Sequence, residues 1–469
     1  MLTLTDEQWF ARLNERRAEQ AREQAKLWKY YDNDQPLAFI AKILQEQGDR
    51  FPPLRFNWSS VVVDSAEERL DVENFRVRGQ DANDEDLTRV WQGNDLDELS
   101  SEAHLAAMVT GQAFITIGAG LSEGADPIVR IDYGDQVAVE VDPLTGEVVA
   151  AIKVWSSDTV SKELDQAVLY LPGRFIEYEF ASTAGVAAKR WNAKRETKQD
   201  SPIVPVVPMF NKPRRGRGRT ELNNILSIVD AVNQTATNMM AALEHHALPR
   251  RWAVNVAESD FQDAQGNPVP AWRIATGAIW AIPRAEDDGT GTQPQPSVGQ
   301  FTGAALDNFH NSVRLLALQA AAQYGIPGHY FGYVTDNPAS ADSIRAMEAR
   351  LVKRVERRQR TFGGAWERAM KIVLTMLGRD TERVQLETVW RDAATPTKSA
   401  QAQAAMELVN AGIIDREQAR EDLGYTQTQR DAISSRATGL DMDSIVQGLR
   451  NVSTGSDLPP ENLPNPASG

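Results

Sequence analysis

The feature that most constrains the fold of this chain is one long helical pattern that follows a loop rich in glycine and proline. From Ile344 to Val373, apolar residues recur at steps of three, four and seven, a spacing that keeps them on one face of a helix. At ~1.5 Å per residue this stretch predicts a helix of roughly 45 Å, longer than most compact domains need. Gly363 and Gly364 lie inside it and predict a bend.

The composition is that of a folded protein with several domains. The chain has 469 residues, of which 42% are hydrophobic and 25% charged, so about three domains are expected. It has no cysteine, which excludes disulfides, thiolate nucleophiles and zinc sites that use cysteine. The N-terminus lacks an apolar signal region, and no apolar run reaches about eighteen residues, so neither secretion nor membrane insertion is predicted.

The net charge of −15 has the wrong sign for a protein that grips nucleic acid by neutralising its phosphates. The same acidity would suit a protein past which a duplex must slide. Solubility alone is an equally good explanation of the charge.

The N-terminal residues to about 111 have mostly helical spacing. Thr5 followed by Gln8 is a capping box for the first helix. The expected helices are Thr5–Tyr31, Leu37–Gln47, Trp58–Leu70, Asp84–Trp91 and Asp95–Thr110, interrupted by a strand at Val72–Val77.

Between residues 112 and 210 the period changes to two, which predicts a β-rich part built from antiparallel hairpins. The expected strands are Ala113–Ile117, Ile128–Ile131, Gln136–Val141, Val148–Trp155, Ala167–Leu171 and Phe175–Phe180.

Helical spacing returns at 220–248 and at 304–322, and about fifty residues of mixed strand and loop lie between the two segments. This order predicts a helical pair with a small cap at one end. Short helices are expected at 398–410 and 416–423. Residues 453–469 are rich in proline and are expected to be disordered.

Motifs for catalysis, cofactors and metals are absent from the sequence. There is no GxxxxGK[ST], GxGxxG, GxSxG or HExxH pattern. His245 and His246 are adjacent, so on a helix they diverge by about 100° and cannot share an ion as residues i and i+4 do. We therefore expect no catalytic, cofactor or metal site.

Two basic segments are candidate contact sites. Arg214, Arg215, Arg217 and Arg219 alternate with glycines directly before a predicted helix. A flexible solvated hinge is the favoured interpretation, and contacts with DNA or an adjacent subunit are the alternative. The long helix has nine basic and four acidic residues between Ala341 and Lys371. For this helix we favour ion pairs between subunits over a solvated face or DNA binding.

Several segments together resemble the portal proteins of tailed double-stranded DNA bacteriophages of the siphophage type. They are 56–77 (FNWSSVVVDSAEERLDVENFRV), 205–234, 242–254, the long-helix junction from Tyr324 to Met376, and 395–426. The resemblance implies an α+β, mostly helical fold. Its parts would be a wing (1–219), a first stem helix (220–248), a clip (249–303), a second stem helix (304–323), a tunnel loop (324–340), a long wing helix with a following strand (341–394), a crown (395–452) and a tail (453–469).

The resemblance also implies a function. Copies would form a ring, a dodecamer in this family, at one capsid vertex of the virion after assembly in the host cytoplasm. The ring would conduct double-stranded DNA and bind the major capsid protein, the terminase large subunit and a head-tail adaptor protein, without enzymatic activity, cofactor or membrane contact. Val334, Thr335, Asp336 and Asn337 would lie nearest the channel. The alternatives are a phage structural scaffold without a channel and a nucleic-acid-processing enzyme.

Overall fold

The computed structural model describes residues 4–37, 54–80, 83–122, 124–157, 164–182, 189–199, 201–247, 251–254, 297–300, 306–332, 341–394, 398–425, 429–430 and 432–435. The chain forms two compact units, Met1–Ala393 and Ala394–Gly469. Helices and antiparallel sheets occupy separate segments, so the fold is α+β as predicted.

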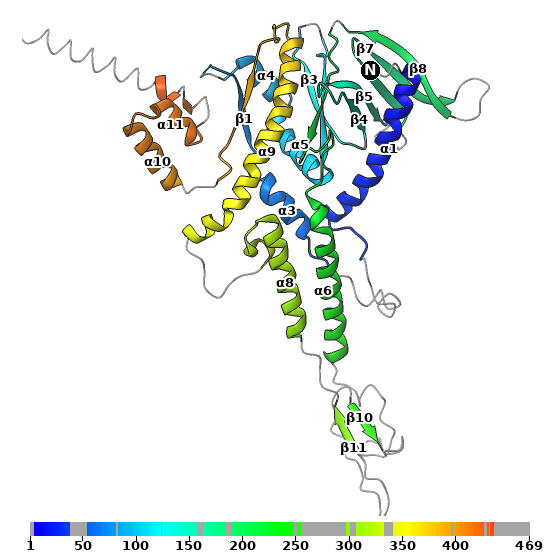
Figure 1. The fold of residues 1–469 in the computed structure, drawn as a ribbon, viewed down its shortest axis with the longest axis vertical. Coiled ribbons are helices and arrows are strands. Elements are labelled where there is room, and N and C mark those ends of the chain that lie inside the picture. Colours follow the sequence, from blue (N-terminus) through cyan, green and yellow to red (C-terminus); the bar gives the residue numbers. More distant parts are fainter. Residues whose placement is uncertain are drawn as a thin grey trace, which may run out of the picture. The chain divides into compact units, whose positions relative to one another are not determined.

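The β-rich part of the first unit contains two antiparallel sheets (Figure 1). One has the order β3-β2-β9, and the other runs β4-β5-β6-β7-β8 in sequence order. Their strands are β2 (Gln112–Gly118), β3 (Ile128–Asp132), β4 (Val137–Val141), β5 (Val148–Trp155), β6 (Gln166–Leu171), β7 (Arg174–Ser182), β8 (Lys189–Lys198) and β9 (Val206–Phe210). The six predicted strands are confirmed, whereas β8 and β9 were not anticipated.

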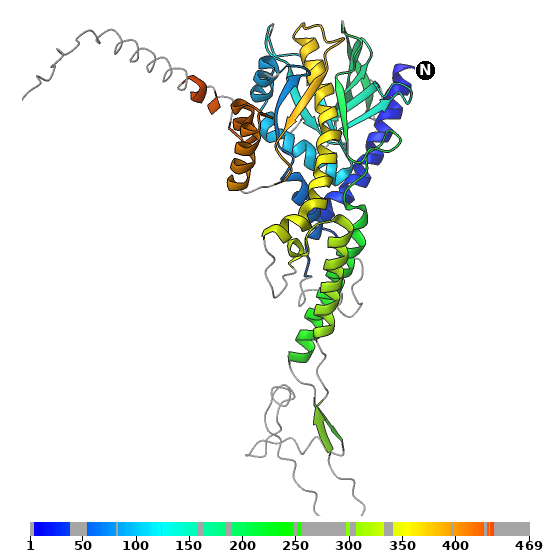
Figure 2. The same ribbon diagram turned by 60° about the vertical axis from the view of Figure 1, so that its left-hand side comes forward.

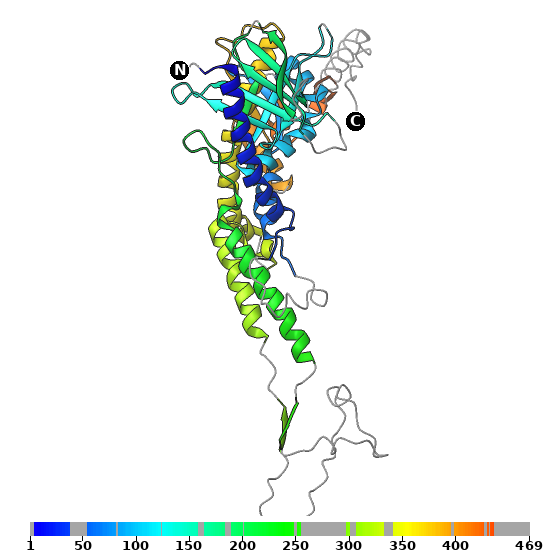
Figure 3. The same ribbon diagram turned by 90° about the vertical axis from the view of Figure 1, so that its right-hand side faces the viewer.

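Alternation along β5 explains how the larger sheet is covered on both faces. Ala150, Ile152 and Val154 pack in the same apolar cluster as Phe10 and Leu13 of α1 (Asp6–Tyr31). Ala151 faces the opposite way, into a cluster shared with the smaller sheet. Helix α1 therefore covers one face of the larger sheet, as Figure 3 also shows. Its predicted capping box between Thr5 and Gln8 is confirmed.

The largest apolar core gathers helices around α9 (Ala341–Met376). Leu351, Val355, Phe362, Trp366 and Met370 of its apolar stripe are fully buried. Around α9 lie α3 (Trp58–Glu67), α4 (Glu85–Gly93), α5 (Leu96–Thr110) and a two-stranded sheet of β1 (Val72–Val77) and β12 (Leu386–Trp390). The predicted long helix is thus confirmed, and it is helical through Gly363 and Gly364.

Two helices leave this core side by side, α6 (Leu226–Ala247) and α8 (Asp307–Tyr324), as Figures 1 and 2 show. Short 3-10 turns adjoin them, Leu222–Asn224 before α6 and Gly328–Phe331 after α8. Between them, β10 (Arg251–Val254) pairs with β11 (Ser297–Gln300). The rest of the segment predicted as a clip lies outside the described residues, as does nearly all of the helix predicted at Leu37–Gln47.

The second unit contains α10 (Lys398–Asn410) and α11 (Arg416–Asp422), which pack against each other. Asp415 caps α11 by accepting a hydrogen bond from the Gln418 backbone N–H at 2.7 Å. Both short helices predicted here are confirmed, and the tail at 453–469 lies outside the described residues.

Candidate functional site

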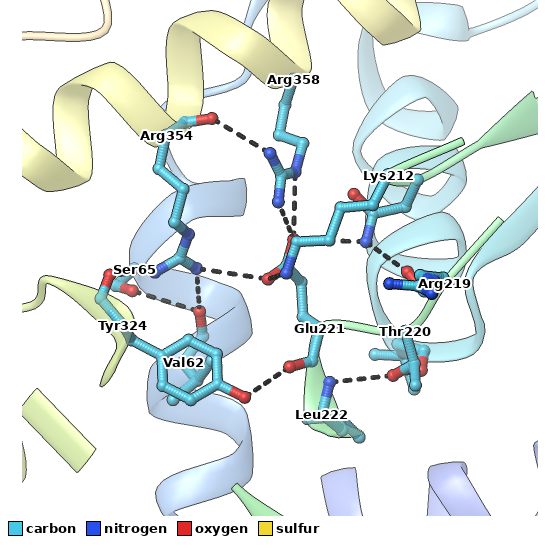
Figure 4. A network of polar contacts seen from close by, with 12 residues as sticks. Val62, Ser65, Lys212, Arg219, Thr220, Glu221, Leu222, Tyr324, Arg354 and Arg358 are labelled. Carbon is cyan, nitrogen blue, oxygen red and sulfur yellow. Dashed lines mark hydrogen bonds and ion pairs between the residues drawn. The ribbon is translucent and has the colours of Figure 1, made fainter. Parts of the chain in front are cut away.

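The polar centre of the first unit is Glu221, which lies where four elements meet. It precedes α6, and the C-terminus of α8, the middle of α9 and the segment after β9 all approach it (Figure 4). Its side chain has no solvent exposure. A buried carboxylate is strongly unfavourable without charged partners, so its contacts define the junction.

Three cations surround the Glu221 carboxylate (Figure 4). Arg358 donates from Nε to Oε1 at 3.0 Å and also from Nη2 to the same oxygen. Lys212 Nζ lies 2.6 Å from Oε2, and Arg354 Nη2 lies 3.9 Å from Oε2. The Asn211 amide donates to Oε1 at 3.2 Å. These partners come from positions up to 137 residues away in the chain.

Electrostatics keeps Glu221 ionised. Burial by itself raises the pKa of this carboxyl group, but Arg358, Arg354 and Lys212 together outweigh it and lower the pKa to about 2. Burial also lowers the pKa of Lys212 and of Arg354, and in both groups Glu221 opposes that shift. The cluster is therefore held together by charge around a carboxylate that is shielded from water.

Two arginines of α9 also cap the end of α8. Arg350 Nη1 donates to the Ala322 carbonyl at 2.8 Å, and Arg354 Nη1 donates to the Tyr324 carbonyl at 3.0 Å. The last carbonyls of a helix have no partner within the helix and carry its negative end, so cations there are favourable. Arg354 and Arg358 also form ion pairs with Glu221 of the same subunit. The prediction that the basic residues of this helix pair between subunits is wrong for these two.

A second polar cluster fastens the described part of the predicted tunnel loop (324–340) to α9. Tyr330, within the loop, donates to Glu348 Oε1 of α9 at 3.0 Å, and Arg69 Nη2 lies 3.2 Å from Glu348 Oε2. Phe331 packs edge-on against Trp58 with ring centroids 5.5 Å apart. The loop residues predicted to lie nearest a channel, Val334, Thr335, Asp336 and Asn337, are outside the described residues.

The basic run before α6 forms a tight β-hairpin. Arg214 and Arg217 exchange two backbone hydrogen bonds, at 2.8 and 3.2 Å. Arg215 and Gly216 between them have φ of 53° and 73°, the positive values that a two-residue type I′ turn needs. We call residues 211–219 the arginine hairpin.

The base of the arginine hairpin is fixed to the wall of the core. The Arg219 backbone N–H donates to the Asn211 carbonyl at 2.7 Å, and the Asn211 backbone N–H donates to the Gly111 carbonyl at 2.9 Å. A Cβ on Gly218 would lie 1.7 Å from the Gly111 carbonyl oxygen, so only glycine allows this approach. The expectation of a flexible hinge is therefore wrong, although the side chains of Arg214, Arg215, Arg217 and Arg219 are exposed as predicted.

The described part of the chain holds no group of three or more His, Asp or Glu side chains arranged to bind a metal ion. Within the same residues, no helix is long and apolar enough to cross a bilayer. His104 is fully buried, stacks on Phe362 and accepts a hydrogen bond from Trp366 Nε1 at 2.9 Å. It serves packing in the core.

The Glu221 cluster was not predicted from the sequence. Two signals for it exist: Glu221 is the first acid after a run of basic residues, and Arg354 and Arg358 are four residues apart and so share a helix face. Neither signal says that the two segments meet.

Comparisons with known proteins give the family. The sequence model of the family described as "Phage portal protein, SPP1 Gp6-like" matches residues 11–435 of this chain. The portal protein of Mycobacterium phage L5 is 35% identical over 412 residues, which cover 85% of this chain and 81% of that protein. The portal protein of Mycobacterium phage D29 is 33% identical over 430 residues, covering 86% and 82%.

Among solved structures, the chain is similar to one in the neck of a native GTA particle with C12 symmetry, with a TM-score of 0.42, 14% identity and coverage of 86% and 93%. It is also similar to one in the virion of a native gene transfer agent particle, with a TM-score of 0.44, 13% identity and the same coverage. Phage portal proteins are structural components of the capsid rather than enzymes. From the family match and the two portal relatives, we conclude that this chain belongs to the phage portal proteins of the SPP1 Gp6-like family.

Proposed function

We propose that copies of this chain close into a ring, expected to have twelve subunits, at one vertex of the capsid. The ring encloses a channel through which double-stranded DNA enters during packaging and leaves during ejection. It also binds the major capsid protein, the terminase large subunit during packaging and a head-tail adaptor protein afterwards. In this proposal α6 and α8 are the stem helices, 249–303 the clip and 395–452 the crown, and assembly takes place in the host cytoplasm.

The observation that carries the proposal is an apolar surface on the helical pair that one subunit leaves uncovered. Leu315 and Leu318 of α8 are 58% and 43% exposed. On α6, the stripe that is fully buried at Val232 continues into Met240 and Leu243, which are 44% and 38% exposed. Leu315 lies on the opposite side of α8 from the inner face that Ala317, Ala320 and Ala321 define, and Leu318 lies on the flank of the helix.

Two different apolar surfaces on one chain favour a ring. A contact between unlike surfaces repeats from copy to copy, and it closes when each step is a fixed rotation about one axis. In a closed ring every copy covers the α8 surface of one neighbour with its own α6 stripe, and its own α8 surface is covered by the α6 stripe of the other neighbour. Neither of these two apolar surfaces then remains exposed.

The chemistry of the helical pair suits the passage of DNA. Over α6 and α8 the charged residues are only Asp230, Glu244, Asp307 and Arg314. The exposed residues of α8 include Asn308, Ser312 and Gln319, whose side chains end in amide or hydroxyl groups. A channel wall without a row of cations does not hold the phosphate backbone tightly, so a duplex can move along it. Val334, Thr335, Asp336 and Asn337 are proposed to line the narrowest part.

The direct test is electron microscopy of the purified protein viewed end-on. We expect annular particles with a central hole wide enough for a duplex. Discs without a hole would instead support a scaffold without a channel, and a stable monomer at high concentration would contradict both ideas.

The conduit role is tested in a phage that lacks its own copy of the gene. A plasmid copy should restore DNA-filled heads, whereas heads assembled with a ring-deficient variant should remain empty. An enzymatic role is tested by incubating the protein with duplex DNA and a divalent metal, where we expect no cleavage.

A further inference from the structure

The arginine hairpin carries positive charges that are not neutralised within its own subunit. In the part of the chain that the structure describes, none of the guanidinium groups of Arg214, Arg215, Arg217 and Arg219 has an ion-pair or hydrogen-bond partner. The backbone beneath them is fixed by the Gly111 contact and by Lys212, which is bound to Glu221. A rigid and exposed group of four cations on a chain with net charge −15 is suited to bind an anionic surface.

A group of negative charges that are not neutralised lies at the C-terminal end of α3. Asp64 and Glu67 are in its last turn and Glu68 is its C-cap, and the last turn has no basic residue. Negative charge at a helix C-terminus is unfavourable because it meets the negative end of the helix dipole. The neighbouring cation, Arg69, is bound to Glu348. Among the residues that the structure describes, no cation forms an ion pair with these three acids.

The hydrogen bonds of these acids come from neutral groups. Tyr31 OH donates to Asp64 at 2.8 Å, and Ser101 Oγ donates to Glu67 at 2.5 Å. Burial raises the pKa of both carboxyl groups, and nearby acids raise it further. The acidic end of α3 is therefore a self-repelling group that a cation from outside the subunit would relieve.

The arginine hairpin and the acidic end of α3 both lie beside the Glu221 cluster, on different sides of it. They are therefore at the same height along the subunit. The Val62 carbonyl of α3 accepts a hydrogen bond from Arg354 at 2.9 Å, and Lys212 of the hairpin binds Glu221 at 2.6 Å. Figure 4 shows Val62 and Arg354 on one side of Glu221, and Lys212 and Arg219 on the other. Copies related by rotation about an axis along the helical pair keep their levels, so such surfaces can meet in every pair of neighbours.

We propose that the arginine hairpin of one copy binds the acidic C-terminal end of α3 in the next copy. This proposal rests on the proposed ring. It adds an electrostatic contact between neighbouring subunits to the apolar contact of the helical pair. It also fixes the direction of the ring, because an arginine hairpin repels another hairpin and accepts only the unlike surface. DNA phosphate is the competing partner, and it is an outcome of the test below.

The first test uses the absence of cysteine from the chain. Arg217→Cys and Glu68→Cys are introduced singly and together, and the assembled protein is oxidised. The double variant should give a ladder of covalent oligomers on a denaturing gel. A mixture of the two single variants should give dimers only, and each single variant alone should give neither. Rings that form normally but yield no cross-link would overturn this contact and leave the proposed ring intact.

The second test is a charge reversal with rescue. Arg214→Glu with Arg217→Glu leaves both positive-φ positions of the turn unchanged. It should raise the protein concentration at half-assembly by about tenfold or more, measured by light scattering after gel filtration at ~0.1 M salt. Glu67→Lys with Glu68→Lys in the same chain should restore assembly, which also shows that the reversed hairpin folds.

The matched control is Lys29→Glu with Arg130→Glu, which makes the same change in net charge at two exposed positions outside both surfaces. Assembly of the hairpin variant equal to that of this control would overturn the contact. So would normal rings that lose affinity for a 30-base-pair duplex in fluorescence anisotropy, because the hairpin would then bind DNA. If the natural sequence forms no ring, the proposed function fails and this contact fails with it.

Discussion

At the scale of single residues, Glu221 shows how one buried charge can connect four elements. Its pKa of about 2 lies below the ordinary value of 4.5, so the native state holds the charged form more strongly than the unfolded chain does. The resulting stabilisation is fully present above about pH 4.5 and is lost as the pH falls from there through the folded pKa. At neutral pH the junction therefore has the full benefit of its ion pairs.

Replacing Glu221 by glutamine should destabilise the protein strongly. The change preserves shape but leaves Arg358, Arg354 and Lys212 without their buried counter-charge, at a cost of about 3–5 kcal/mol in the free energy of unfolding. Urea denaturation at pH 7.5 measures it. Glu98→Gln, at an exposed position of α5, is the control and should change the free energy by less than about 0.5 kcal/mol. A loss below about 1 kcal/mol for Glu221→Gln would show that the cluster does not hold the junction together.

His104 should make stability depend on pH in a different range. Burial lowers its pKa from 6.5 to about 3, against a smaller opposing effect of the Leu70 backbone. The folded protein thus keeps the imidazole neutral, and its contribution is full above about pH 6.5 and falls as the pH drops towards 3. Between pH 7 and 5 the unfolding free energy should lose about 2 kcal/mol from this group.

The His104→Gln variant isolates that contribution, because glutamine can still accept the hydrogen bond from Trp366 but does not titrate. The difference in unfolding free energy between the natural sequence and the variant, measured at pH 7 and at pH 5, should shrink by about 2 kcal/mol. An unchanged difference would mean that His104 is protonated in the folded state at pH 5.

At the scale of elements, the contact between α9 and β12 explains one of the two adjacent glycines inside the long helix. A Cβ on Gly363 would come within 3.1 Å of Trp390 Nε1 and 3.5 Å of Thr388 Cβ. Thr388 Oγ1 also donates to the Gly363 carbonyl at 3.2 Å. Gly363 thus lets the strand approach the helix. Gly364 has no such neighbour, since its nearest atom is the end of the Arg368 side chain at 3.7 Å.

The two glycines should therefore respond differently to alanine. Gly364→Ala should raise the free energy of unfolding by about 0.5–1 kcal/mol, because alanine is the better helix former. Gly363→Ala gains the same propensity but must displace Trp390 or Thr388, so it should be less stable than Gly364→Ala by about 1 kcal/mol or more. Chemical denaturation of both variants gives the comparison. Equal stabilities would mean that the contact with β12 adjusts without cost.

At the scale of the whole molecule, the exposed apolar residues of α6 and α8 connect the fold to assembly. Those of α8 are left uncovered by the described part of the same helical pair, because Leu315 lies opposite the inner face of α8 and Leu318 on its flank. Their burial against another copy is worth about 25 cal/mol per Å² of apolar area before the costs of association. Ring formation should therefore depend on them while the fold of the subunit does not.

Leu315→Asp with Leu318→Asp should abolish rings and leave the far-ultraviolet circular dichroism spectrum of the subunit unchanged, because a desolvated aspartate opposes the contact. Multi-angle light scattering reports the assembly. Leu121→Asp with Leu144→Asp is the control, since both residues are at least 91% exposed on loops outside the helical pair, and this pair should still form rings. Rings from the α8 variant would place the subunit interface elsewhere.

The sequence by itself determined the elements whose patterns are local. The Thr5–Gln8 cap, the apolar stripe of α9 and the alternation along β5 each show within a few residues which side of an element is buried. The highly charged strand β8 lacks such an alternation and was missed for that reason. Only the tertiary structure decided that the arginine run is a fixed hairpin and that Glu221 meets Arg358, 137 residues further along. Propensity and periodicity act between near neighbours in the chain, whereas the pairing of buried charges depends on which distant segments the core brings together.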